Sequence, residues 1–89
     1  MAHEPEITMY ARERFCPDVT RARTRLEYHG LVWTEFDVEA DTDKRAEMEA
    51  ITGKRNVPQV VIGDRVLIEP SIEEIDDALV AAGFDIAAD

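Results

Sequence analysis

The single cysteine of the chain, Cys16, is followed directly by a proline and separates a strand pattern from a helix pattern. Residues 6–11 alternate between apolar and polar side chains, which is typical of a short strand. From Pro17 to about His29 the apolar residues recur with helical spacing, and proline is well tolerated in the first turn of a helix. Gly30 stands where a helix C-cap is expected. The pattern therefore predicts a thiol at the start of a helix.

Two further segments extend this beginning into a βαβ unit followed by a second helix. Residues 31–38 alternate and are rich in strand-forming side chains, so we expect a second strand parallel to the first. Residues 41–53 predict a short helix with Asp41, Thr42 or Asp43 as its N-cap and Gly53 as its stop. Few apolar residues lie in this segment, which indicates a largely exposed helix.

The last third of the chain predicts a hairpin and a final helix. Residues 59–62 and 65–68 are two apolar strand patterns, and the pair Gly63-Asp64 between them is typical of a two-residue hairpin turn. Ser71 and Glu74 have the spacing of a capping box at a helix start. The expected order is β-α-β-α-β-β-α, which is an α/β fold.

The length and composition predict one small domain that spans residues 1–89. The chain has 89 residues, of which 45% are hydrophobic, enough for one core. One cysteine excludes an internal disulfide and a cysteine metal cluster, and no group of His, Asp and Glu has metal-ligand spacing. No signal peptide pattern or apolar run of membrane-spanning length is present. We therefore expect a soluble, cytoplasmic protein without a metal, and a monomer.

The charge is strongly negative overall but unevenly distributed. Twenty acidic and 10 basic residues give a net charge of -10, which argues against binding nucleic acid or an anionic membrane. Half of the basic residues cluster around Cys16, namely Arg12, Arg14, Arg21, Arg23 and Arg25. These arginines form either a solvated helix face or a local positive field at the thiol.

Cys16 is the main candidate for chemistry. Backbone N–H groups and the macrodipole at a helix start favour an anion, and so a reactive thiolate, although Asp18 opposes it. The alternative is a buried cysteine that acts as a small apolar residue. Val19, one turn further, occupies the place of a resolving cysteine and cannot attack a mixed disulfide. Any redox chemistry must therefore be monothiol, with an outside thiol completing the cycle.

The segment "KRNVPQVV" is a second candidate site. Pro58 precedes a strand and lacks an N–H for the sheet, so it is expected to end a loop. A cis Val57–Pro58 bond would expose the backbone of Val57 to a docked peptide, but only about 5% of X–Pro bonds are cis, which favours trans from the residues alone. His3 and His29 are isolated, and His29 is expected to be a core or capping residue.

Taken together, "FCPDVTRAR" and "TGKRNVPQVVIGDR" resemble the glutaredoxin branch of the thioredoxin fold. The resemblance covers residues from Ile7 to about Gly83. It implies a four-stranded mixed sheet flanked by helices, and it implies that Pro58 is cis.

The resemblance also implies roles for individual residues. Cys16 would be the nucleophile that takes glutathione as a mixed disulfide. Val57 would pair its backbone with the cysteinyl part of glutathione, and Arg55 would face the glycyl carboxylate. The cation that the family carries shortly before its cysteine would be Arg12 or Arg14.

The chain departs from the family after the hairpin, where the Gly-Gly and acidic pair that hold the γ-glutamyl group are absent. The segment "RVLIEPSIEEI" is similar instead to the N-terminal domain of glutathione S-transferases, where a Glu-Ser pair grips the same group. Glu69 and Ser71 would take this role, although Pro70 separates them. The helix N-terminus at Ser71 could also receive a carboxylate.

We therefore expect a monothiol oxidoreductase that uses glutathione as its co-substrate and acts on glutathionylated or disulfide-containing proteins. The alternative is a non-catalytic binding module or redox sensor of the same fold. Transport of an iron–sulfur cluster is disfavoured, because "CPDV" lacks the glycine and serine of the Cys-Gly-Phe-Ser relatives.

Overall fold

The computed structural model describes residues 6–86, which form a four-stranded sheet and three helices. His3 lies outside the described residues. The elements follow the predicted order and have these bounds: β1 Ile7–Ala11, α1 Pro17–Tyr28, β2 Thr34–Asp37, α2 Thr42–Thr52, β3 Gln59–Ile62, β4 Arg65–Ile68 and α3 Ile72–Ala81.

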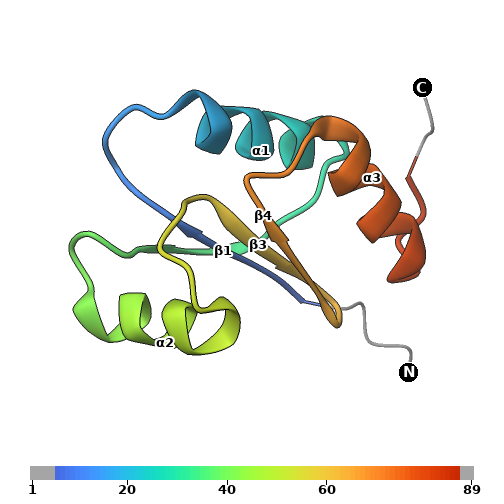
Figure 1. Ribbon diagram of the computed structural model, residues 1–89. Helices are drawn as coiled ribbons and strands as arrows, with labels where there is room; N and C mark the ends of the chain where they lie inside the picture. The colour runs from blue at the N-terminus through green and yellow to red at the C-terminus, as the bar shows by residue number, and fades with distance from the viewer. Residues whose placement is uncertain (1–5, 87–89) are drawn as a thin grey trace.

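The sheet is mixed, with the strand order β2-β1-β3-β4. β1 and β2 are parallel, as the βαβ unit requires, whereas β3 runs antiparallel to both β1 and β4. Figure 1 shows α1 and α3 together on one face of the sheet and α2 on the other. This is the fold that the sequence predicted.

Alternation along β1 divides the core between the two faces of the sheet. Ile7, Met9 and Ala11 pack with buried residues of α1, β3 and α3. Tyr10 points to the opposite face, where it packs with Val38 and with Met48, the buried residue of α2. The prediction that α2 is largely exposed is thus confirmed, because Met48 is the single residue of this helix that is buried.

The helix ends use local signals that the sequence showed. Asp41 is the residue that caps α2, accepting the backbone N–H of Lys44 at 3.1 Å. Both bonds of the capping box between Ser71 and Glu74 form at the start of α3. Gly30, with φ of 71°, follows α1 and allows the N–H of Leu31 to reach the carbonyl of Leu26 at 3.1 Å.

β2 is shorter than predicted. The alternating pattern suggested residues 31–38, but the strand covers Thr34–Asp37. The backbone N–H of Leu31 is engaged with the last turn of α1, so the chain is still leaving the helix there. Hydrogen bonding at the helix end therefore overrides the strand pattern at this point.

α1 and α3 are joined by a nearly buried polar cluster. Asp76 of α3 accepts hydrogen bonds from Arg25 at 2.9 and 2.5 Å and pairs with His29 at 2.8 Å. These contacts, led by the hydrogen bond from Arg25, lower the pKa of Asp76 to about 2. His29, expected to be a core or capping residue, is buried in this cluster.

Within residues 6–86, no helix has both the length and the apolar character to cross a membrane.

Candidate active site around Cys16

Cys16 is the N-cap residue of α1, as the Cys-Pro pattern predicted. Its backbone is extended, with φ of -148° and ψ of 117°, and its carbonyl accepts the N–H of Thr20 at 2.9 Å. The residue is 8% exposed, whereas its neighbour Phe15 is 78% exposed. Val19 packs in the core beside it. The thiol therefore lies just beneath the surface, at the junction of a strand and a helix.

Most of the arginines near Cys16 are engaged with carboxylates. Four ion pairs account for them: Arg14–Glu39, Arg21–Asp18, Arg23–Glu35 and Arg25–Asp76. The partners come from α1 itself, from β2, from the loop after β2 and from α3. The cluster is therefore neither a simple solvated face nor a concentrated positive field, because folding brings acidic groups to these arginines.

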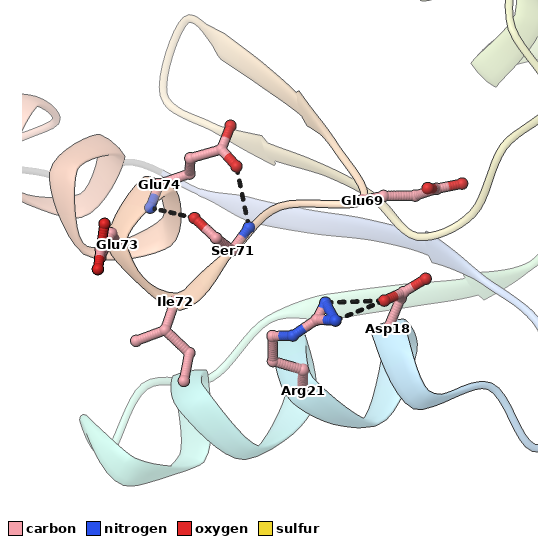
Figure 2. A pocket seen from close by; sticks show the side chains of 7 residues that line it. All are labelled: Asp18, Arg21, Glu69, Ser71, Ile72, Glu73 and Glu74. Atoms are coloured by element: carbon pink, nitrogen blue, oxygen red, sulfur yellow. Dashed lines mark hydrogen bonds and ion pairs between the residues drawn. The ribbon is translucent and has the colours of Figure 1, made fainter.

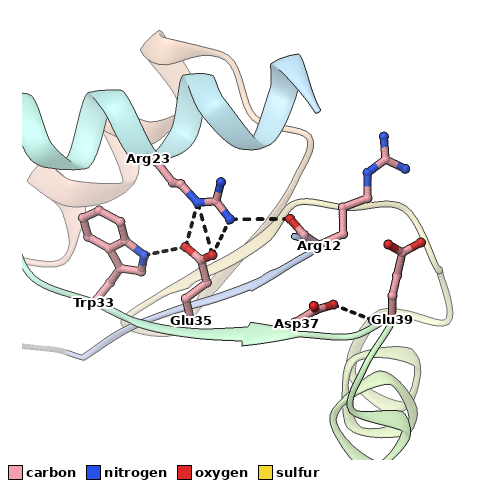
Figure 3. A network of polar contacts seen from close by, with 6 residues as sticks. All are labelled: Arg12, Arg23, Trp33, Glu35, Asp37 and Glu39. Atoms are coloured by element: carbon pink, nitrogen blue, oxygen red, sulfur yellow. Dashed lines mark hydrogen bonds and ion pairs between the residues drawn. The ribbon is translucent and has the colours of Figure 1, made fainter. Parts of the chain in front are cut away.

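Arg23 is bound to Glu35 of β2 and lies close to the end of β1. Its guanidinium donates to Glu35 at 2.5 Å and approaches the carbonyl of Arg12 at 3.5 Å, and Trp33 holds the same Glu35 at 3.0 Å (Figure 3). The hydrogen bond to Glu35 is the main cause of the raised pKa of Arg23, and the charge of Cys16 adds a smaller part. Seven residues separate Cys16 from Arg23, so both lie on the same helix face.

A cleft of about 200 Å³ opens where the end of β1 meets α2 and the loop before β3, and we name it the basic cleft. Three predicted site residues, Arg12, Arg55 and Val57, line it together. Arg45 of α2, which was not predicted, lines it too, because only the tertiary structure places this helix beside the loop. The remaining lining residues are Val38, Glu39 and Met48.

Of the two candidate cations before the cysteine, Arg12 rather than Arg14 lines this cleft. Arg14 is 70% exposed and forms two hydrogen bonds with Glu39, at 3.0 and 2.6 Å. The Arg12 side chain makes one weak contact, from Nη2 to the carbonyl of Phe15 at 3.5 Å. Its Nε is buried and has no hydrogen-bond partner among residues 6–86.

The Val57–Pro58 peptide bond is cis. Val57 lines the basic cleft, and Pro58 is fully buried behind it. The Pro58 carbonyl accepts the backbone N–H of Glu69 at 2.8 Å, which links this loop to the chain after β4. Val57 also packs against the buried cluster of Tyr10, Val38 and Met48, which positions it at the cleft wall.

A second cleft, about 520 Å³ in volume, lies between the first turns of α1 and α3, and we name it the acidic cleft. It contains the other two predicted site residues, Glu69 and Ser71. Four of its lining residues are carboxylates and one is a cation, and the full lining is Asp18, Arg21, Glu69, Ser71, Ile72, Glu73 and Glu74.

The polar groups of the acidic cleft largely satisfy one another (Figure 2). Ser71 accepts the N–H of Glu74 at 3.1 Å, and its own backbone N–H donates to the Glu74 carboxylate at 3.1 Å. Glu69 extends away from Ser71 and accepts from Asn56 at 3.0 Å. The start of α3, expected to be able to receive a carboxylate, is already capped by Glu74.

Metal chemistry finds no support among the described residues. Between residues 6 and 86, no group of three or more His, Cys, Asp or Glu side chains is arranged to hold a metal ion. The Cys16 sulfur remains the candidate nucleophile, and five of the other candidate residues line the two oppositely charged clefts: Arg12, Arg55, Val57, Glu69 and Ser71.

Comparison with known proteins agrees with this geometry. The family model described as Glutaredoxin matches residues 7–67. A glutaredoxin from Neisseria meningitidis is 39% identical over 59 residues, which cover 65% of this chain and 68% of that protein. The residues that the family model matches include Cys16, all residues that line the basic cleft and the hairpin up to Leu67.

Solved structures show the same fold. The glutaredoxin of Archaeoglobus fulgidus superposes with a TM-score of 0.74 at 22% identity, covering 84% of this chain and 86% of that one. A buckwheat glutaredoxin–glutathione complex superposes with a TM-score of 0.67 at 19% identity, covering 88% and 76%. With the family model matching most of the chain, this protein belongs to the glutaredoxin family of thiol–disulfide oxidoreductases.

Proposed function

We propose that this protein reduces glutathione mixed disulfides through Cys16 alone, with glutathione as the reductant. The observation that carries the proposal is the position of the only cysteine, at the N-cap of α1 and directly before Pro17. Val19 occupies the place of a second thiol and is buried in the core. A monothiol cycle needs no other cysteine.

In the first step, the Cys16 thiolate attacks the glutathione sulfur of a mixed disulfide. The bond between Cys16 and this sulfur forms while the original disulfide bond breaks, and the released substrate thiolate takes a proton from solvent. A glutathione thiolate then attacks the same sulfur, releasing glutathione disulfide and restoring the Cys16 thiolate. One glutathione is consumed: it is oxidised to glutathione disulfide while the mixed disulfide is reduced, which releases the substrate as a thiol.

The basic cleft would hold the glycyl end of glutathione. Arg12 and Arg55 line it, and guanidinium groups form strong, directional hydrogen bonds with carboxylates. Val57 lines the same cleft and would pair its backbone with the cysteinyl part. The buckwheat protein, captured with glutathione, supports this use of the fold.

The acidic cleft would receive the γ-glutamyl end. Glu69 is an exposed carboxylate at its edge and suits the ammonium of this group. Ser71 Oγ accepts the N–H of Glu74, and its hydroxyl proton would still donate to the carboxylate of this group. Such a cycle needs excess reduced glutathione, which places the protein in a reducing compartment such as the cytoplasm.

The test is turnover of a small glutathione mixed disulfide, coupled to glutathione reductase and followed by oxidation of its nicotinamide cofactor. We expect turnover by the natural chain and none by Cys16→Ser, which keeps the size of the side chain. Circular dichroism of both proteins shows that loss of turnover does not reflect unfolding.

Absence of turnover from the folded natural chain would overturn the proposal. In that case mass spectrometry after incubation with glutathione disulfide separates the two remaining possibilities. A stable Cys16–glutathione adduct would indicate a redox sensor, whereas an unmodified thiol would indicate a binding module.

A further inference from the structure

The basic cleft carries more positive charge than one carboxylate needs. Three arginines line it, Arg12, Arg45 and Arg55, against one carboxylate, Glu39. Glu39 is engaged on both oxygens by a fourth arginine, Arg14, at 3.0 and 2.6 Å. The hydrogen bonds from Arg14 are the main cause of the lowered pKa of Glu39.

One further carboxylate serves the other two lining arginines. Glu49 Oε1 lies 3.3 Å from Arg45 Nε and 2.8 Å from Arg55 Nε. The lining residues and their ion-pair partners thus comprise four guanidinium groups and two carboxylates. This region therefore carries two more positive than negative charges, although the net charge of the whole protein is -10.

Asp37, whose charge acts on Glu39, does not remove the surplus. Asp37 does not line the cleft, and one of its oxygens accepts the backbone N–H groups of Glu39 and Ala40 at 2.9 and 3.2 Å. Even with Asp37 counted, the positive groups exceed the negative ones. Figure 3 shows Asp37 beside the base of Glu39, and no hydrogen bond or ion pair is drawn from the Arg12 guanidinium to either carboxylate.

Arg12 supplies a donor that the fold leaves unused. Its Nε is buried without a hydrogen-bond partner among residues 6–86, and within these residues the guanidinium makes one weak 3.5 Å contact with the Phe15 carbonyl and no ion pair. Its charge also helps to lower the pKa of Glu39, whose two oxygens are bound by Arg14. A buried donor without an acceptor costs free energy, so an arriving anion that accepts from it gains correspondingly.

We propose that the basic cleft recognises a group with two negative charges, a phosphate or a dicarboxylate, at the end of a small thiol. Its volume of about 200 Å³ suits such an end group rather than a whole tripeptide. Arg12 and Arg45 are the residues that distinguish a doubly charged from a singly charged end. The inference rests on the proposed function, in which the sulfur of the bound thiol reacts at Cys16. It predicts that thiols with a doubly charged end group bind more tightly than glutathione.

Malonate and malonamate test the charge requirement, because they have nearly the same size and differ by one negative charge. Each is titrated into the 15N-labelled full chain at pH 7.5 and low salt, and the arginine Nε–Hε signals in NMR spectra report directly on the cleft. We expect malonate to bind about tenfold more tightly, since one additional charge-assisted hydrogen bond is worth this much. The Arg12 signal should shift most.

Matched variants separate the cleft from the overall charge. Arg12→Gln and Arg45→Gln should each remove most of the preference for malonate. Arg65→Gln makes the same change of net charge on exposed β4, outside the cleft, and should retain the preference. Arg45 is partly exposed on α2, so its variant keeps the test valid even if Arg12→Gln fails to fold.

Equal binding of malonate and malonamate, or equal loss in all three variants, would overturn the inference. A third titration with inorganic phosphate at pH 8 distinguishes the sources, because tighter binding than malonate indicates phosphorylated thiols and weaker binding indicates dicarboxylate thiols. The NMR measurement needs no turnover. Failure of the proposed function, seen as absent turnover, is therefore distinguishable from failure of this inference.

Discussion

The basic and acidic clefts use charged side chains in opposite ways. In the acidic cleft, Ser71 and Glu74 satisfy each other, and Asp18 is paired with Arg21 of the same helix. In the basic cleft, the guanidinium groups exceed the carboxylates that contact them, and Arg12 Nε has no partner among residues 6–86. Most charged groups in the first region bind one another, whereas the second region has an excess of guanidinium groups that a ligand can use.

This difference follows the two faces of the sheet. The acidic cleft lies between α1 and α3, where short contacts within and between helices give carboxylates and arginines nearby partners. The basic cleft joins the end of β1 to α2 and the loop before β3, which are distant in sequence. Substitutions on the α1–α3 side should therefore change stability first, and substitutions in the basic cleft should change binding first.

The largest effect on stability is expected for Asp76→Asn, on the α1–α3 side. Asp76 is mostly buried and its pKa is about 2 instead of 3.8, so its contacts with Arg25 and His29 contribute about 2 kcal/mol at pH 7. Because the folded-state pKa is depressed, this contribution is present above about pH 4 and is lost as the pH falls towards 2.

Urea denaturation at several pH values checks this prediction. Asp76→Asn should lower the free energy of unfolding at pH 7 and flatten its decline between about pH 4 and 2. Asp77→Asn, at an exposed position on the same helix, is the matched control and should behave like the natural chain. An undiminished decline in Asp76→Asn would show that other carboxylates cause the acid sensitivity.

The next effect concerns the basic cleft. Arg12→Gln should lower kcat/KM for a small glutathione mixed disulfide about tenfold, mainly through KM, because a charge-assisted hydrogen bond to the substrate carboxylate is lost. The free energy of unfolding should change little, since Arg12 pairs with no carboxylate among residues 6–86. Arg65→Gln, which makes the same change of net charge outside the cleft, is the control. An unchanged KM in Arg12→Gln would show that Arg12 does not bind the substrate.

A smaller effect is expected for Ser71→Ala in the acidic cleft. The substitution removes the hydroxyl that accepts the N–H of Glu74 and should lower the free energy of unfolding by about 1 kcal/mol. Thermal unfolding measures the change, and Ser71→Thr, which retains the hydroxyl, should recover most of it. A melting temperature unaffected by Ser71→Ala would show that the capping box contributes little.

The smallest effect is expected for Glu73→Gln. This residue is exposed in the acidic cleft, where its charge repels an anionic substrate. Its removal should raise kcat/KM about twofold at low ionic strength, and the gain should vanish at high salt, where surface charges are screened. A gain that persists at high salt would contradict this electrostatic explanation.

The order of the elements and most of their ends could be predicted from the amino-acid sequence. Local signals sufficed because each acts over a few residues: Asp41 caps α2, Gly63-Asp64 turns the hairpin and Ser71 with Glu74 starts α3. The Cys-Pro junction likewise predicted the thiol at the start of α1. β2 is the exception, because it begins later than predicted. The backbone N–H of Leu31, the first residue of the predicted strand, bonds instead to the carbonyl of Leu26 in α1.

Which arginines remain available to a ligand depends instead on how the chain folds in three dimensions. Arg12 and Arg14 are equivalent candidates in the sequence, but Glu39 pairs with Arg14 and leaves Arg12 to the cleft. Arg45 gives no sequence signal, since its role depends on where α2 packs beside Val57. Electrostatic interactions act through space between residues that are far apart along the chain, so no local pattern encodes their partners.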